Sequence, residues 1–348
     1  MRTIINREEM TVGRKKENLF EIDLIKGVCI LTVVLGHSIN TGALEYKPGL
    51  EQFLGDWTRF AVPLFLLVSG FLFNKSGVST WTLAGKLTKR IVPAYLICSV
   101  LMLWLRTMWL RPSLGELNWA QIAGMFIIGE ALGIYYFVFV ISYLYTFSLW
   151  WRHWPIRWLY VLWAVEVIAT IMFYVKLPWF FPDKPEWFFI ILFRHPVIHL
   201  LPYLTGWLLS VHYDEIRPWF RRNSGNLIMI TLAADVVLMM IIEKLQAYAP
   251  HQLLIQVHVY VFFVGFICLG IRWPINSRII EFLSKASYGI YLIHFPIVRA
   301  IQYAYNGRNA MTLERILVPW IITCLASGLI ILCFRGVFGK RSRYIIGG

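Results

Sequence analysis

The sequence predicts an all-α integral membrane protein with about ten transmembrane helices and with both termini in the cytoplasm. Of the 348 residues, 58% are hydrophobic and 15% are charged, and the mean hydropathy is +0.63. Soluble domains carry about 25% charged residues, so this composition indicates a membrane protein. The 16 Trp, 17 Tyr and 24 Phe residues suit aromatic belts at the two membrane interfaces.

Apolar segments of about 20 residues, the length that crosses a bilayer as a helix, recur along the chain. The predicted spans are, in order, 22–40, 57–74, 91–109, 132–150, 156–175, 190–211, 225–243, 252–271, 286–304 and 315–335. The run over 118–150 is too long for one span, so Trp119–Ile128 is interpreted as a re-entrant or interfacial segment. No loop is long enough for a soluble domain. We therefore predict one transmembrane domain over 1–348, with a cytoplasmic N-terminal segment (1–20) and a cytoplasmic tail (336–348).

The distribution of basic residues predicts the orientation. With the N-terminus inside, the inner segments contain 21 of the 33 Lys and Arg residues, and the outer segments contain eight. Cytoplasmic loops carry such an excess, which places both termini inside. The same distribution accounts for the net charge of +14 without a nucleic-acid partner. The polar N-terminal segment lacks the apolar core of a cleavable signal peptide, so we expect the first span to remain in place.

The first span contains three ionisable residues, Asp23, Lys26 and His37, within an apolar stretch. Such residues are unfavourable in hydrocarbon, and they indicate a functional site. Lys26 and His37 share one helix face, and Asp23 lies one turn before Lys26, where the two can pair. The alternative is structural, with a snorkelling lysine and a histidine that is hydrogen-bonded to a neighbouring helix.

Five segments, in order along the chain, resemble motifs of the acyltransferase-3 family. Lys26 and His37 have the family's spacing of a basic residue, ten residues and a histidine, and the surrounding sequence is most similar to the fucose 4-O-acetylase branch. The other four segments are Val62–Phe71, the basic start of the third span (Lys86, Lys89, Arg90, Pro93 and Tyr95), Leu200–Tyr203 with Gly206, and Ser287–His294. Tyr135–Val138 departs from the Trp-Phe-Leu motif expected near the fourth span.

The resemblance implies transfer of an acyl group, usually acetyl from acetyl-CoA, to a sugar hydroxyl. His37 would deprotonate the hydroxyl or carry the acyl group itself, and the sequence leaves both routes open. Asp23 and Lys26 would support His37 or contact the donor. Because CoA is cytoplasmic, its phosphates need cations at the inner face, and Lys86, Lys89 and Arg90 are the candidates. An ordinary basic inner loop is the alternative interpretation of these three residues. Acetyl-CoA is expected as a co-substrate, with no bound cofactor.

Further polar residues are candidates for a cavity that holds the acceptor, a glycan or a lipid-linked sugar. They are Ser69, Arg194, His195, His199, His258, Tyr288, His294 and Arg299. Arg194 and Arg299 could instead reach the outer headgroups, and His294 could have a structural role. His195 and His199 have a spacing that suits a metal ion, but no carboxylate or cysteine stands near them in sequence, so no metal is predicted.

The resemblance also implies a multi-pass protein of the bacterial inner membrane, in contact with lipids, acetyl-CoA and the acceptor. Succinyl-CoA is the alternative donor. Two other classes of protein remain open. A secondary transporter for a sugar or a lipid-linked intermediate would use the same intramembrane polar groups, and a non-catalytic component of a polysaccharide assembly complex would act through its partners.

Overall fold

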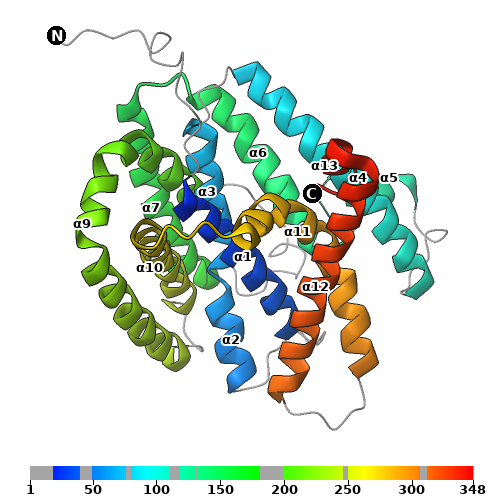
Figure 1. Cartoon of the computed structure of the whole chain (residues 1–348). Helices are drawn as coiled ribbons and strands as arrows, with labels where there is room; N and C mark the ends of the chain where they lie inside the picture. The colour runs from blue at the N-terminus through cyan, green and yellow to red at the C-terminus, as the bar shows by residue number, and fades with distance from the viewer. Residues whose placement is uncertain are drawn as a thin grey trace.

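The computed structural model describes residues 19–39, 49–75, 80–109, 118–127, 129, 132–180, 199–245, 250–305 and 312–347. Within these ranges every regular element is a helix and there is no strand, which confirms the predicted all-α class. Figure 1 shows the helices gathered in one bundle with α1 near its centre. Most of the predicted N-terminal segment lies outside the described residues.

The helices follow one another with short connections. In chain order they are α1 (Phe20–Ile39), α2 (Leu50–Thr58), α3 (Ala61–Lys75), α4 (Thr80–Trp109), α5 (Trp119–Ile127), the 3-10 turn η3 (Gly133–Tyr135), α6 (Tyr136–Trp151), α7 (Ile156–Phe180), α9 (Leu200–Lys244), α10 (Pro250–Arg272), α11 (Arg278–Tyr305), α12 (Thr312–Phe338), the 3-10 turn η5 (Gly339–Arg341) and α13 (Ser342–Ile345).

Eight helical segments of the described chain are long and apolar enough to cross a membrane, as expected for a multi-pass protein. The predicted spans 190–211 and 225–243 are not separated by a loop, because residues 200–244 form the single helix α9, which is drawn as an arc in Figure 1. Polar residues over 212–224 suggested a loop, but polarity alone does not end a helix. The predicted span 286–304 lies in α11, which is not among the eight because polar side chains lower its hydropathy. The count of ten and the orientation remain predictions.

Helix α1 packs against α3, α10, α11 and α12. Ile25, Cys29 and Ile30 have no exposed surface, as expected for a helix that neighbours surround. Gly27 allows α11 to approach closely, since a Cβ atom there would lie 3.5 Å from the Cβ atom of Leu283. The central position of α1 places its ionisable residues inside the bundle.

Helices α3 and α9 cross at two glycines. A Cβ atom on Gly70 would lie 2.0 Å from the carbonyl oxygen of Tyr203, and one on Gly206 would lie 1.8 Å from that of Leu67. Both distances are far below van der Waals contact, so only glycine permits this backbone approach. The two glycines fall within the segments that resemble family motifs.

One end of the bundle, here called the basic end, is where α1 and α11 begin and where α3, α10 and α12 finish. Glu21 on α1 is 1% exposed and accepts hydrogen bonds from the hydroxyl of Tyr213 (2.7 Å) and from Nε of Arg217 (2.9 Å). A buried carboxylate is tolerated when it is paired and hydrogen-bonded. These contacts therefore fix the start of α1 to α9.

The predicted cytoplasmic tail is folded against the bundle. Helix α12 continues to Phe338, and α13 packs on α4. Ile346 is 5% exposed, and Gly347 is so close to α11 that a Cβ atom there would lie 2.5 Å from Cδ1 of Tyr288. The apolar Tyr344-Ile345-Ile346 run explains this packing, because Ile346 joins the main hydrophobic core.

Candidate active site

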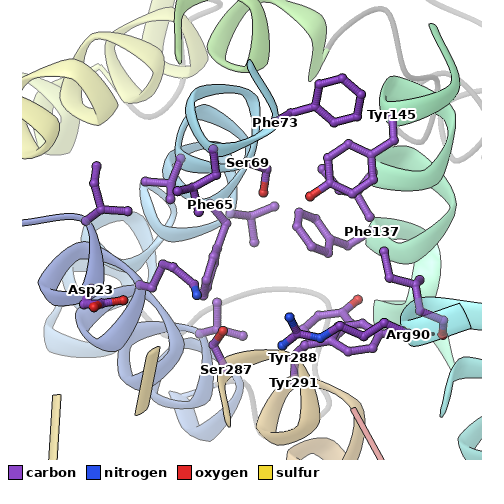
Figure 2. Close-up of a pocket in the computed structure, with 18 of the residues that line it drawn as sticks. Asp23, Phe65, Ser69, Phe73, Arg90, Phe137, Tyr145, Ser287, Tyr288 and Tyr291 are labelled. Atoms are coloured by element: carbon purple, nitrogen blue, oxygen red, sulfur yellow. Dashed lines mark hydrogen bonds between the residues drawn. The ribbon is translucent and has the colours of Figure 1, made fainter. Parts of the chain in front are cut away.

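A cavity of about 500 Å³ opens at the basic end and extends along α1. Its walls come from α1, α3, α4, α6 and α11. Figure 2 shows Asp23, Ser287, Tyr288, Tyr291 and Arg90 along one side and Phe65, Ser69, Phe73, Phe137 and Tyr145 along the opposite side. The cavity lies between a side supplied by α1, α4 and α11 and a side supplied by α3 and α6.

Charged side chains gather in the part of the cavity near the basic end. Asp23, Lys26, Lys75 and Arg90 all line it, which gives three cations and one carboxylate. The predicted Asp23–Lys26 ion pair is not among the contacts within 4.0 Å in the part of the chain that the structure describes; Asp23 instead accepts a hydrogen bond from the hydroxyl of Ser284. Lys75 pairs with Asp214 at 2.7 Å. The excess positive charge suits an anionic ligand.

Three tyrosines join the walls of the cavity to the surrounding helices. The hydroxyl of Tyr288 donates to the carbonyl oxygen of Ile91 (3.0 Å), and the hydroxyl of Tyr291 donates to that of Ile134. The fully buried Tyr135 donates to the carbonyl oxygen of Leu292 at 2.7 Å. Because the hydroxyl groups are bonded to the backbone, the rings of Tyr288 and Tyr291 serve as cavity wall.

The cavity becomes apolar along α1, where Val33, Val62 and Phe65 line it. His37 is one helical turn beyond Val33 on the same face of α1. Its ring centroid lies 5.3 Å from that of His294 and 5.3 Å from that of Phe295. The residues Lys26, Val33 and His37 therefore follow one line from the charged part of the cavity to a pair of histidines.

The predicted donor-binding residues separate in the structure. Lys89 and Arg90 are both exposed, but only Arg90 is part of the cavity lining. Lys86 lies on α4, outside the residues whose side chains are described.

The predicted acceptor-binding residues do not form one group among the described residues. Ser69 and Tyr288 line the cavity, and His294 packs on His37. His258 bonds to Asp235 and packs against Phe60 and Phe262, and Arg299 bonds to Gln302 at 3.2 Å. His199 precedes α9, with its ring 6.1 Å from that of Tyr136. Arg194 and His195 lie outside the described residues.

Sequence reasoning missed several residues of the site. Lys75, Tyr145, Ser287 and Tyr291 line the cavity. The apolar spans gave no signal for Tyr145, but Ser287 and Tyr291 stand within the motif at Ser287–His294, so the motif itself indicated them. No group of three His, Cys, Asp or Glu side chains in the described ranges could hold a metal ion.

The chain was compared with known proteins. The model of the family described as "Acyltransferase domain" (Acyl_transf_3) matches residues 19–335. No curated protein and no solved structure gave a significant match. The match includes every residue of the cavity and both histidines of the pair. A helical membrane bundle with this match over nearly its whole length belongs to the acyltransferase-3 family of membrane acyltransferases.

Proposed function

We propose that this acyltransferase moves an acetyl group from cytoplasmic acetyl-CoA to a sugar hydroxyl of an envelope or exported polysaccharide, in the cytoplasmic membrane of a bacterium. The observation that carries the proposal is the course of the cavity, which starts among cations at the basic end and extends along α1 as far as Val33, one helical turn before His37, which does not itself line it. A transferase that joins a cytoplasmic donor to an exported acceptor needs such a path through the bundle.

The two parts of the cavity suit the two parts of the donor. CoA carries phosphates, and Lys75, Arg90 and Lys26 offer charge-assisted contacts to them. The acetyl thioester is uncharged, and the stretch lined by Val33, Val62 and Phe65 is apolar. Apolar walls provide no cation for the free carboxylate of a succinyl group, so acetyl fits this stretch better than succinyl does.

His37 is the proposed base. Its imidazole takes the proton of the acceptor hydroxyl while the hydroxyl oxygen attacks the thioester carbon. The carbon–sulfur bond then breaks, and the proton passes from His37 to the thiolate, which leaves CoA as a thiol and the sugar as an acetyl ester. In the covalent variant, a His37 nitrogen attacks the thioester carbon, the carbon–sulfur bond breaks, and the thiolate leaves with the proton lost from the imidazole. The sugar oxygen then attacks the acetyl-imidazole, and its proton passes to the His37 ring as the carbon–nitrogen bond breaks.

The test is acyl transfer by the purified full-length protein in lipid nanodiscs. Radiolabelled acetyl-CoA is supplied with envelope glycan, and wild type is compared with His37→Ala and with His153→Ala, a control at an exposed histidine in the turn after α6. We expect label in glycan for wild type and His153→Ala, and a loss of at least about 100-fold for His37→Ala.

Equal labelling by wild type and His37→Ala would support the proposed acetyl transfer but would show that His37 is not needed for it. No labelling by wild type, together with no binding of acetyl-CoA, would contradict the proposal and favour a transporter. If the glycan were labelled from succinyl-CoA and not from acetyl-CoA, the donor would be succinyl-CoA.

A further inference from the structure

His294 on α11 has an environment that assigns its two ring nitrogens. The side chain has no exposed surface, and Nδ1 lies 2.8 Å from the carbonyl oxygen of Tyr291 and 3.1 Å from that of Ile290. Carbonyl oxygens only accept hydrogen bonds, so Nδ1 is the nitrogen that carries the proton. Nε2 of the neutral ring is then an acceptor at the end of the ring furthest from the backbone.

The acceptor Nε2 is buried and has no hydrogen-bond partner within the ranges that the structure describes. Unpaired buried acceptors are uncommon in native proteins and call for an explanation. Among the rings around His294, Phe295 has no polar hydrogen and Tyr291 already donates its hydroxyl to Ile134. His37 is the neighbouring ring that can supply an N–H group.

The separation of the two imidazole rings suits a direct contact. Their centroids are 5.3 Å apart with an interplanar angle of 38°, so the two rings are direct neighbours. They are not hydrogen-bonded as they stand, because Nε2 of His294 is unpaired in the described structure. A rotation of the His37 ring about its side-chain torsions would bring one of its N–H groups onto that nitrogen. The rings come from parallel parts of α1 and α11, since Asp23 bonds to Ser284 near the start of both helices and the two histidines meet further along.

The end of α1 is held at a second point by the same helix. The side-chain amide of Gln302 donates to the carbonyl oxygens of His37 (3.2 Å) and Ser38 (2.8 Å), which are among the backbone groups left unbonded in the last turn of a helix. Arg299 donates to the amide oxygen of Gln302 at 3.2 Å. These contacts fix the backbone of His37 relative to His294.

Resting on the function proposed above, we infer that His294 is a positioning residue: in the reacting enzyme the His37 ring turns so that Nε2 of His294 accepts its N–H, which leaves the other nitrogen of His37 free to take the proton of the sugar hydroxyl. In serine hydrolases a carboxylate holds the catalytic histidine in this way. An uncharged imidazole performs the same task without placing an anion beside His37 within the membrane. The proton moves from the acceptor oxygen to His37 and then to the CoA sulfur, while the His37–His294 hydrogen bond is retained.

The experiment compares His294→Gln with His294→Leu in the purified full-length protein. Glutamine places an amide oxygen near the position of Nε2, whereas leucine fills the space without an acceptor. We expect His294→Leu to lower kcat about 100-fold with KM for acetyl-CoA changed less than about twofold, and His294→Gln to restore about tenfold of that loss. The control is His153→Gln, a change at an exposed histidine in the turn after α6, and it should keep both kcat and its pH profile.

A spectroscopic arm keeps this inference separate from the proposed function. Nitrogen-15 spectra of protein labelled at its eight histidines report the tautomer of each ring whether or not the protein transfers acetyl groups. We expect His294 protonated at Nδ1 and a single His37 tautomer that becomes mixed in His294→Leu. Three results would each overturn the inference. They are a wild-type kcat in His294→Leu, equal losses of kcat in His294→Leu and His294→Gln, and a His37 spectrum that is the same in wild type and His294→Leu. A wild type without transfer activity but with the expected spectra would contradict the proposed function alone.

Discussion

Two adjacent residues of α4 differ in their relation to the cavity. Both are exposed, but Arg90 contributes to the cavity lining and Lys89 does not. Both lie at the basic end and carry the same charge, so they contribute similarly to the orientation of the protein in the membrane. Comparing the two separates binding of the donor from the general effect of basic residues.

We predict that Arg90→Ala raises KM for acetyl-CoA by about tenfold, the effect of losing one charge-assisted contact of about 1.4 kcal/mol. Lys89→Ala should change KM less than about twofold. Initial rates over a range of acetyl-CoA concentrations measure both. Equal increases in the two variants would mean that the basic residues act through the overall field, and that Arg90 has no specific contact with the donor.

The residues of the first span were predictable because ionisable groups are rare in hydrocarbon, and Asp23, Lys26 and His37 stood out for that reason. Their partners were not predictable. Asp23 bonds to Ser284 and His37 packs on His294, and both contacts depend on how α1 and α11 are placed side by side. Spacing within one helix favoured an Asp23–Lys26 pair. Asp23 is close enough to Lys26 to interact with it electrostatically, but its hydrogen bond comes from Ser284 on another helix.

At the level of helices, the described glycines that leave least room for a Cβ atom lie at the crossing of α3 and α9. This crossing positions Ser69, on the cavity side of α3, relative to the rest of the bundle. Helices in membranes associate through such close approach at small residues. The two apolar parts of α9 were predictable from the sequence, but their union in one helix was not. The polar residues between them lie on the surface of the helix and do not form a loop.

We predict that Gly206→Ala destabilises the protein by about 1–3 kcal/mol, because the added methyl group must push α3 and α9 apart. The control is Gly85→Ala on α4, where a Cβ atom would meet nothing within 4 Å. That change should be neutral or stabilising by up to about 1 kcal/mol, since alanine favours the helix. Thermal unfolding in detergent measures both, and equal stability of the two variants would contradict the importance of the crossing.

For the whole molecule, the folded C-terminal segment extends the bundle past the end of the family match at residue 335. The segment joins α12, α4 and the cavity-lining Tyr288, so elements distant in sequence share one surface at the basic end. The helical membrane class was predictable from composition. The packing of the C-terminal segment was not, because its many basic residues favoured a cytoplasmic tail.

We predict that removal of residues 340–348 lowers stability by roughly 2 kcal/mol, the value of burying one isoleucine side chain such as Ile346, and raises KM for acetyl-CoA because Tyr288 loses its support. Removal of Gly348 alone keeps Ile346 and Gly347 and serves as the control. Unfolding in detergent and steady-state kinetics are the measurements. Wild-type behaviour of the longer deletion would show that the segment does not support the cavity.

The contacts of Glu21 and Asp23 also bear on how the chain is made. Tyr213 and Arg217 follow Glu21 by 192 and 196 residues, and Ser284 follows Asp23 by 261 residues. At a synthesis rate of about 5–20 residues per second, α1 waits roughly 10–40 s before the first of these partners leaves the ribosome. During that interval neither carboxylate can make the contact that it has in the folded bundle. Biogenesis of this protein is therefore completed late, when α9 and α11 arrive and allow the first helix to take its central position.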